Sequence, residues 1–111
     1  MPSKLGLTKS ERITKQFEFR EVMRGGRLLT ATTFRGYVLT GENLTRKAGF
    51  IAGKALGKAN KRNRARRLLK EAYRLLKPSL PETGFKVVFN ATPGINDAEF
   101  EDVKRDMTGF F

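Results

Sequence analysis

Residues 61–76 combine an apolar stripe with the densest run of positive charge in the chain. The apolar residues recur at i, i+3, i+4 and i+7, a spacing typical of a helix that packs one face on a core. They are Ala65, Leu68, Leu69, Ala72, Tyr73 and Leu76. Pro78 marks the end of this helix. Because the stripe has to be buried, the rest of the chain must supply a surface for it.

Three short segments rich in β-branched and aromatic residues supply that surface. Their compositions predict strands over residues 34–40, 48–53 and 84–90. Gly41, Glu42 and Asn43 predict a turn after the first strand. The basic helix lies between the second and third strands, so these elements form a strand–helix–strand crossover unit.

Two further helices are predicted at the ends of the chain. One covers residues 14–24, with Thr14 as its N-cap and two glycines at its end. The other begins at residues 96–99 with a capping-box-like start. Its inward face consists of Phe100, Val103, Met107 and either Phe110 or Phe111.

The length of 111 residues suits a single domain with one modest core. We therefore expect an α+β protein over residues 1–111, a two-layer α/β sandwich with a mixed central sheet and about three helices. The polar residues 1–11 are expected to be flexible.

The formal net charge of +12 is concentrated around the basic helix. Residues 46–77 hold twelve basic side chains and one acidic side chain, Glu71, which gives a net charge of +11. The rest of the chain holds eleven basic and ten acidic side chains, a net charge of +1. A surface that is charged only for solubility does not need this segregation, whereas a surface that binds a polyanion does. The charge pattern therefore favours a nucleic acid as the partner.

The composition also excludes several kinds of site. The chain has no cysteine and no histidine, which rules out disulfides and thiolate metal sites and removes the usual zinc ligand and general base. No apolar run approaches the length needed to span a bilayer, and the amino terminus lacks the apolar segment of a secretory signal. We therefore expect a cytoplasmic protein that does not act at a membrane.

Cations crowd the amino-terminal end of the basic helix, at Lys58, Lys61, Arg62 and Arg64. The helix dipole is positive there, so each cation is expected to cost roughly 0.3 kcal/mol or more. Phosphate groups bound to the free N–H groups and to arginine side chains would remove this conflict. The sequence thus predicts a helix start that binds phosphate.

Residues 57–74 resemble the "RNR" signature region of the bacterial ribonuclease P protein family. In that family Arg-Asn-Arg opens a helix and is followed by a basic pair, paired aliphatic residues and Ala-aromatic-Arg. The residues that fit this pattern are Arg62, Asn63, Arg64, Arg66, Arg67, Leu68, Leu69, Ala72, Tyr73 and Arg74. The resemblance extends to both sides, at Phe19, Gly26, Phe34, Tyr37, Gly49, Lys54, Gly57 and residues 85–91.

The resemblance implies a ribosomal-protein-like α/β sandwich with a left-handed crossover, although a right-handed crossover is the usual one. It also implies that the protein joins a catalytic ribonuclease P RNA to form an endonuclease that removes the 5′ leader of precursor tRNA. The RNA would carry the chemistry with Mg²⁺, so no catalytic residue and no tightly bound metal are expected in this chain. No protein oligomer is required.

Two surfaces follow from the resemblance. The catalytic RNA would contact Arg62, Asn63, Arg64, Arg66 and Arg67, with Lys58, Lys61, Lys70 and Arg74 extending that surface. The leader would lie between the first helix and the sheet, against Phe19, Met23, Tyr37 and Lys54. Met23 replaces an aromatic residue of the family, and Ala55 interrupts a basic pair near Lys54. Aromatic stacking combined with cations suits single-stranded RNA.

Simpler roles remain open for some of these residues. Arg67 is spaced to pair with Glu71 at i, i+4, and Phe19 fits plain core packing. A small ribosomal protein or another structural RNA-binding protein is the alternative function. A protein nuclease acting alone is disfavoured because Asp97, Glu99, Glu101 and Asp102 are better explained as acids at a helix start.

Overall fold

The computed structural model describes residues 11–111. The expectation of flexibility for residues 1–11 therefore lies outside the described residues except at Glu11. The Glu11 carboxylate pairs with Lys77 Nζ at 2.9 Å and with an Arg46 guanidinium nitrogen at 3.6 Å.

The central element is a four-stranded sheet with the order β1–β2–β4–β3. Its strands are β1 (Arg27–Thr30), β2 (Phe34–Thr45), β3 (Lys47–Ile51) and β4 (Thr83–Ala91). The β1–β2 and β2–β4 pairs are antiparallel, whereas β3 and β4 are parallel. The sheet is therefore mixed, as the sequence predicted.

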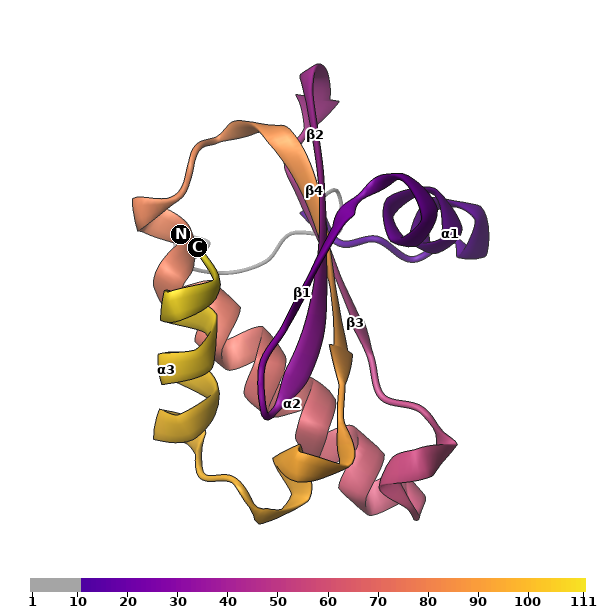
Figure 1. Cartoon of the computed structure of the whole chain (residues 1–111), viewed down its shortest axis with the longest axis vertical. Helices are drawn as coiled ribbons and strands as arrows, with labels where there is room; N and C mark the ends of the chain where they lie inside the picture. Colours follow the sequence, from indigo (N-terminus) through magenta and orange to yellow (C-terminus); the bar gives the residue numbers. More distant parts are fainter. Residues whose placement is uncertain (1–10) are drawn as a thin grey trace, which may run out of the picture.

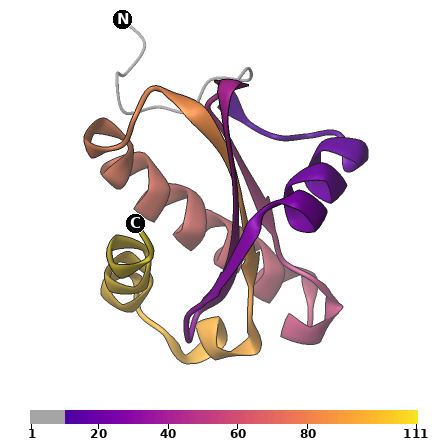
Figure 2. The same cartoon turned by 45° about the horizontal axis from the view of Figure 1, so that its top comes forward.

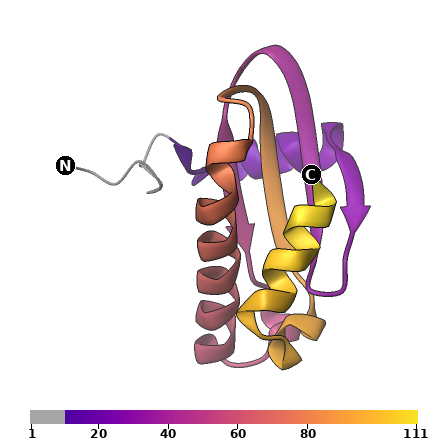
Figure 3. The ribbon, with the colours of Figure 1, turned by 90° about the vertical axis from the view of Figure 1, so that its left-hand side faces the viewer.

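Within residues 11–111, three α-helices cover the sheet, namely α1 (Gln16–Gly25), α2 (Ala59–Leu76) and α3 (Phe100–Phe110). Helices α2 and α3 lie side by side on one face, and α1 lies on the opposite face (Figures 1 and 3). Short 3₁₀ helices lie between strands and α-helices: η2 (Lys54–Leu56) before α2, η3 (Lys77–Ser79) after it and η4 (Pro93–Asp97) before α3. The α+β class and the mixed sheet with three helices are thus confirmed.

The main core lies between the sheet and the α2–α3 layer. Ala65, Leu69, Ala72 and Tyr73 are buried, as the apolar stripe required, and Leu68 and Leu76 pack against this core. Phe89 of β4 is fully buried and stacks on Phe50 at a centroid distance of 5.8 Å. The apolar residues of α2 therefore bind it to the sheet, and its basic residues are left at the edges and outside.

The crossover from β3 through α2 to β4 joins two adjacent parallel strands. The second view shows α2 running diagonally behind the sheet between them (Figure 2). The left hand of this crossover stays a prediction from the resemblance.

Three boundary predictions were wrong. Residues 41–43 do not form a turn, because β2 continues through them to Thr45 with an irregular register between Thr40 and Thr45. Thr14 is not the N-cap of α1, which begins after Lys15. The last helix does start with a capping box, as predicted, but Glu99 and Asp102 form it, so the helix begins after Glu99 and not at Asn96; the Glu99 backbone N–H donates to Asp102 Oδ2 at 2.9 Å. Within residues 11–111, no helix is long and apolar enough to cross a bilayer.

Candidate nucleic-acid interface

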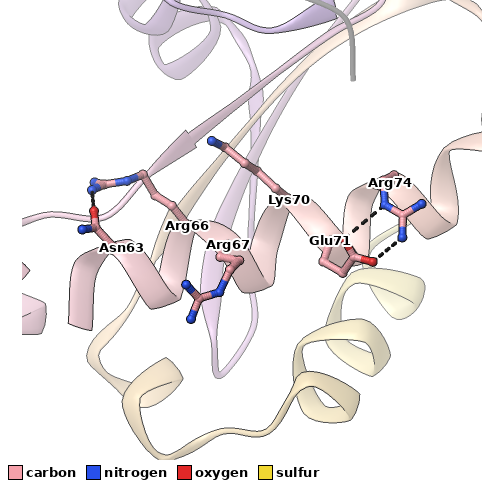
Figure 4. Close-up of a pocket in the computed structure, with 6 residues that line it drawn as sticks. All are labelled: Asn63, Arg66, Arg67, Lys70, Glu71 and Arg74. Carbon is pink, nitrogen blue, oxygen red and sulfur yellow. Dashed lines mark hydrogen bonds and ion pairs between the residues drawn. The ribbon is translucent and has the colours of Figure 1, made fainter. Parts of the chain in front are cut away.

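The solvent-facing side of α2 carries a shallow hollow lined by basic side chains (Figure 4). Because its lining residues recur at intervals of three and four, they all lie on one side of the helix. They are Asn63, Arg66, Arg67, Lys70, Glu71 and Arg74. Each of them except Glu71 belongs to the surface predicted for the catalytic RNA.

Internal pairs fix part of this surface. Glu71 accepts hydrogen bonds from Arg74, one of them from Nε to Oε2 at 3.1 Å, and Arg74 lowers the pKa of that carboxyl group. Asn63 Oδ1 accepts a hydrogen bond from the Arg66 guanidinium. The simpler role considered for Arg67 is wrong, because Glu71 pairs with Arg74 at i, i+3 instead. Arg67 is exposed and points away from the helix (Figure 4).

Arg64 is hydrogen-bonded to the segment that precedes α3. Its guanidinium donates to the backbone carbonyl of Ile95 at 3.1 Å and to that of Ala98 at 2.6 Å. Ile95 lies in η4, and Ala98 follows it just before α3, so this side chain holds the approach to α3 against α2. The sequence contains no signal for this role, since the partners are main-chain oxygens more than thirty positions away.

Arg62 is partly buried at the edge of the helix. Its Nε atom is buried and has no hydrogen-bond partner in the described part of the chain. A buried donor without a partner is unfavourable by about 1–3 kcal/mol.

The amino-terminal end of α2 is the predicted phosphate site, and its N-cap residue contributes no side-chain cap. Lys58 occupies the N-cap position and makes no capping hydrogen bond with its side chain. Lys58 and Lys61 are exposed, and the Lys61 backbone N–H donates to Asn60 Oδ1 at 3.0 Å. A helix start with several cations, whose N-cap side chain makes no capping hydrogen bond, is suited to an anion.

Three of the four predicted leader-binding residues lie on the opposite face of the sheet. Phe19 and Met23 of α1 and Tyr37 of β2 are half-buried and pack around Val22 and Val88. Their partial exposure leaves each available for contact while also anchoring α1. The structure thus brings three of the four predicted residues together.

Close approach of α1 to the sheet depends on Gly49. A Cβ atom at Gly49 would lie 2.4 Å from the ring of Phe19. Real Cβ atoms do not approach other atoms so closely, so a larger residue at this position would displace Phe19. The glycine that matched the family pattern is therefore explained by packing.

Lys54, the fourth predicted residue, lies apart from these three in η2. It is exposed and lines a separate hollow together with Arg35 and Asn90. Arg35 and Asn90 are direct neighbours across β2 and β4, and Ile51 is the neighbour of Asn90 in β3. Sequence reasoning missed Arg35 and Asn90. Side chains of a strand alternate between its two faces, so Arg35 and Tyr37, two positions apart in β2, share a face. This alternation was the signal from which Arg35 could have been predicted beside Tyr37.

A cluster of charges holds α1 on the sheet. Glu18 Oε2 lies 3.2 Å from both Lys47 Nζ and Lys86 Nζ, and Glu21 pairs with Lys86 at 3.4 Å. Burial raises the pKa of Glu18, but hydrogen bonds from Lys86 and Lys47 outweigh it and leave the pKa below its ordinary value. The contacts with Glu18 and Glu21 outweigh the effect of burial on Lys86 and raise the pKa of its ammonium group. In residues 11–111, no group of three or more acidic residues is placed to hold a metal ion.

The fold and this surface together define a small basic α+β protein of the nucleic-acid-binding class. A sequence model of the Ribonuclease P family matches residues 7–111, and the chain belongs to this family.

Curated relatives agree with this assignment. The chain is 36% identical over 102 residues to the ribonuclease P protein component of Chloroflexus aggregans, covering 91% of this chain and 75% of that protein. It is 40% identical over 90 residues to the ribonuclease P protein component of Chlamydia trachomatis, covering 79% and 72%. The chain is thus a ribonuclease P protein subunit that functions in tRNA processing.

Solved structures share the fold. The Staphylococcus aureus RNase P protein superimposes with a TM-score of 0.79 at 20% identity, covering 91% of this chain and 92% of that one. The RNase P protein from Thermotoga maritima gives a TM-score of 0.77 at 21% identity, covering 90% and 94%.

Proposed function

We propose that this protein binds a catalytic RNA through α2 and the 5′ leader of precursor tRNA through the face that carries α1. The observation that carries this proposal is the separation of two different surfaces by one sheet. Helix α2 presents cations and an uncapped amino-terminal end, whereas the other face presents half-buried aromatic side chains beside cations. Phosphates of a folded RNA suit the first surface, and single-stranded nucleotides suit the second.

The chain supplies binding and positioning in this proposal, and Mg²⁺ ions held by the RNA supply the chemistry of cleavage. Arg67 and Lys70 contact phosphates of the catalytic RNA, together with Lys58 and Lys61 at the start of α2. Tyr37 stacks on a leader base, and Lys54 and Arg35 neutralise leader phosphates. A single copy of the protein, acting in the cytoplasm, is sufficient.

The test is cleavage of a precursor tRNA by a bacterial ribonuclease P RNA at low Mg²⁺ concentration, with and without the protein. We expect the protein to restore cleavage at the 5′ end of the mature tRNA. The double variant Arg67→Ala/Lys70→Ala should weaken binding to the catalytic RNA. The affinity of this variant for the RNA should also depend less on salt. The slope of log affinity against log salt concentration should be smaller by roughly 0.7–0.9 for each lost phosphate contact.

Tyr37→Ala provides the matched variant for the other surface. It should raise the concentration of precursor needed for cleavage and leave the affinity for the catalytic RNA unchanged. An absence of stimulation by the unaltered protein with its own species' RNA would disprove the proposal. Co-purification with ribosomal subunits instead of a single RNA of a few hundred nucleotides would favour the alternative, a structural RNA-binding protein.

A further inference from the structure

Helix α1 has an outer face that none of the roles above uses. Phe17 lies on it and retains 65% exposure, the highest value among the large apolar side chains of the described residues. Arg20 and Arg24 follow at i+3 and i+7 and are also exposed. Because this spacing places all three on one side of the helix, they form a continuous surface, here called the outer α1 surface.

The charge of this surface is not neutralised by its own helix. The two carboxylates of α1 are directed to the sheet, where Glu18 pairs with Lys47 and Lys86, and Glu21 pairs with Lys86. Between residues 11 and 111, no acidic side chain forms a salt bridge with Arg20 or Arg24. The outer α1 surface is therefore an aromatic ring next to two unpaired guanidinium groups.

A single exposed apolar side chain needs no explanation by itself. An exposed aromatic ring beside two arginines is more specific, because bases stack on rings and on guanidinium planes while phosphates pair with the charges. Residues 17–24 span about 10 Å along the helix axis, enough to follow a short stretch of extended strand.

The position of α1 decides which RNA this surface meets. Phe17 and Phe19 are two residues apart on α1 and therefore point to different sides of the helix. Phe19, like Tyr37, packs against the buried cluster of Val22 and Val88 on the face proposed for the leader. Helix α2, the proposed contact for the catalytic RNA, lies across the sheet (Figures 1 and 2). A leader strand bound near Phe19 and Tyr37 has to pass around α1 to reach Phe17, so only a long leader makes both contacts.

We propose that Phe17, Arg20 and Arg24 bind leader nucleotides farther from the cleavage site than those held near Phe19 and Tyr37. The inference rests on the proposed function and adds a second contact for long leaders. Phe17 stacks on one base, and the two arginines pair with the phosphates on either side of it.

The experiment compares precursor tRNAs with leaders of about four and about twelve nucleotides, bound to the complex of protein and catalytic RNA. For the unaltered protein, the long leader should bind more tightly. In Phe17→Ala, the ratio of long-leader to short-leader affinity should fall about five- to tenfold, the lower part of the range for one stacked base. Phe17→Leu keeps an apolar side chain without a ring and should lose a similar amount, whereas Phe17→Trp should restore the ratio.

Arg20→Gln/Arg24→Gln tests the charges independently. The long-leader affinity of this double variant should depend less on salt, with a log–log slope smaller by about 1.4 for two single-strand phosphate contacts. The slope for the short leader should match that of the unaltered protein. Thermal unfolding of each variant provides the control for folding, since all three side chains are exposed.

A fluorescent base gives a direct readout of stacking. The chain has no tryptophan, so 2-aminopurine placed at successive leader positions is observed without interference. Quenching at a distal position that disappears in Phe17→Ala would support the proposal.

The outcomes separate the two proposals. If the unaltered protein neither stimulates cleavage nor binds either leader, the proposed function fails. If it stimulates cleavage and Phe17→Ala leaves the length ratio unchanged, only the outer α1 surface is refuted. Reduced self-association of Phe17→Ala in sedimentation, with an unchanged length ratio, would instead assign Phe17 to a protein contact and overturn the inference.

Discussion

Arg64 and Arg67 differ in what their guanidinium groups contact, although both belong to the same signature. Arg64 donates to the carbonyls of Ile95 and Ala98, whereas Arg67 extends into solvent. Arg64→Ala should therefore lower the free energy of unfolding by about 1.5–3 kcal/mol, because two carbonyls lose a charged donor. Arg67→Ala should change it by less than about 0.5 kcal/mol. Urea unfolding of both variants tests this, and equal stabilities would contradict the assignment of Arg64 to packing.

Glu18 connects the position of α1 to pH. A carboxyl group whose pKa is lower in the folded than in the unfolded protein stabilises the fold above its unfolded pKa. This stabilisation is lost as the pH falls through the pKa that the group has in the folded protein. The pKa of Glu18 is lowered from 4.5, so its contribution should be complete at neutral pH and decline below about pH 4.5.

Glu18→Gln should accordingly destabilise the protein at pH 7 by about 1–3 kcal/mol and make its unfolding less sensitive to acid. Glu21→Gln is the matched control, since the Glu21 side chain is 55% exposed and contributes less. Thermal unfolding between pH 3 and pH 7 measures both effects. An identical acid dependence in Glu18→Gln and the unaltered protein would exclude Glu18 as the titrating group.

Helix α2 is less stable at its first turn than a capped helix would be, because its N-cap side chain makes no capping hydrogen bond. Lys58→Ser introduces a capping hydroxyl and should raise the free energy of unfolding by about 0.5–1.5 kcal/mol relative to Lys58→Ala. Both variants remove the same cation, so both should bind the catalytic RNA more weakly than the unaltered protein. Melting temperature and RNA affinity, measured on the two variants, separate capping from charge.

If Lys58→Ser and Lys58→Ala melted at the same temperature, the first turn of α2 would be capped by another group. If both retained full RNA affinity, Lys58 would lie outside the RNA contact.

The elements also show where sequence reasoning is sufficient. The three main strands, the apolar stripe of α2 and the outward charge were predictable, because side-chain periodicity depends only on local geometry. The turn at residues 41–43 was wrong because β2 continues through glycine and polar residues into an irregular segment. Asn96 was expected to begin the last helix, but its side chain donates to the Leu56 carbonyl instead. Such long-range partners leave no local signal.

The two surfaces of the whole molecule were predictable to different degrees. The charge concentrated in residues 46–77 predicted a basic surface on α2 without help from the fold. The opposite face depends on strand pairing, because Arg35 and Asn90 become neighbours only when β2 pairs with β4. The resemblance supplied Phe19 and Tyr37 on that face. It supplied neither Arg35 nor the outer α1 surface, since no position of the matched pattern falls there.

The uneven charge should also determine how the free protein responds to salt. The cations of α2 repel one another and the amino-terminal end of the helix dipole, a destabilisation of about 1 kcal/mol or more. Salt screens these exposed charges, whereas the partly buried Glu18 cluster is screened much less.

The melting temperature of the RNA-free protein should therefore rise by about 4–8 °C at high salt. At low salt, the double variant Arg67→Gln/Lys70→Gln should have a higher melting temperature than the unaltered protein. Its melting temperature should also rise less when salt is added. A melting temperature that falls with salt would show that attraction, not repulsion, dominates the surface.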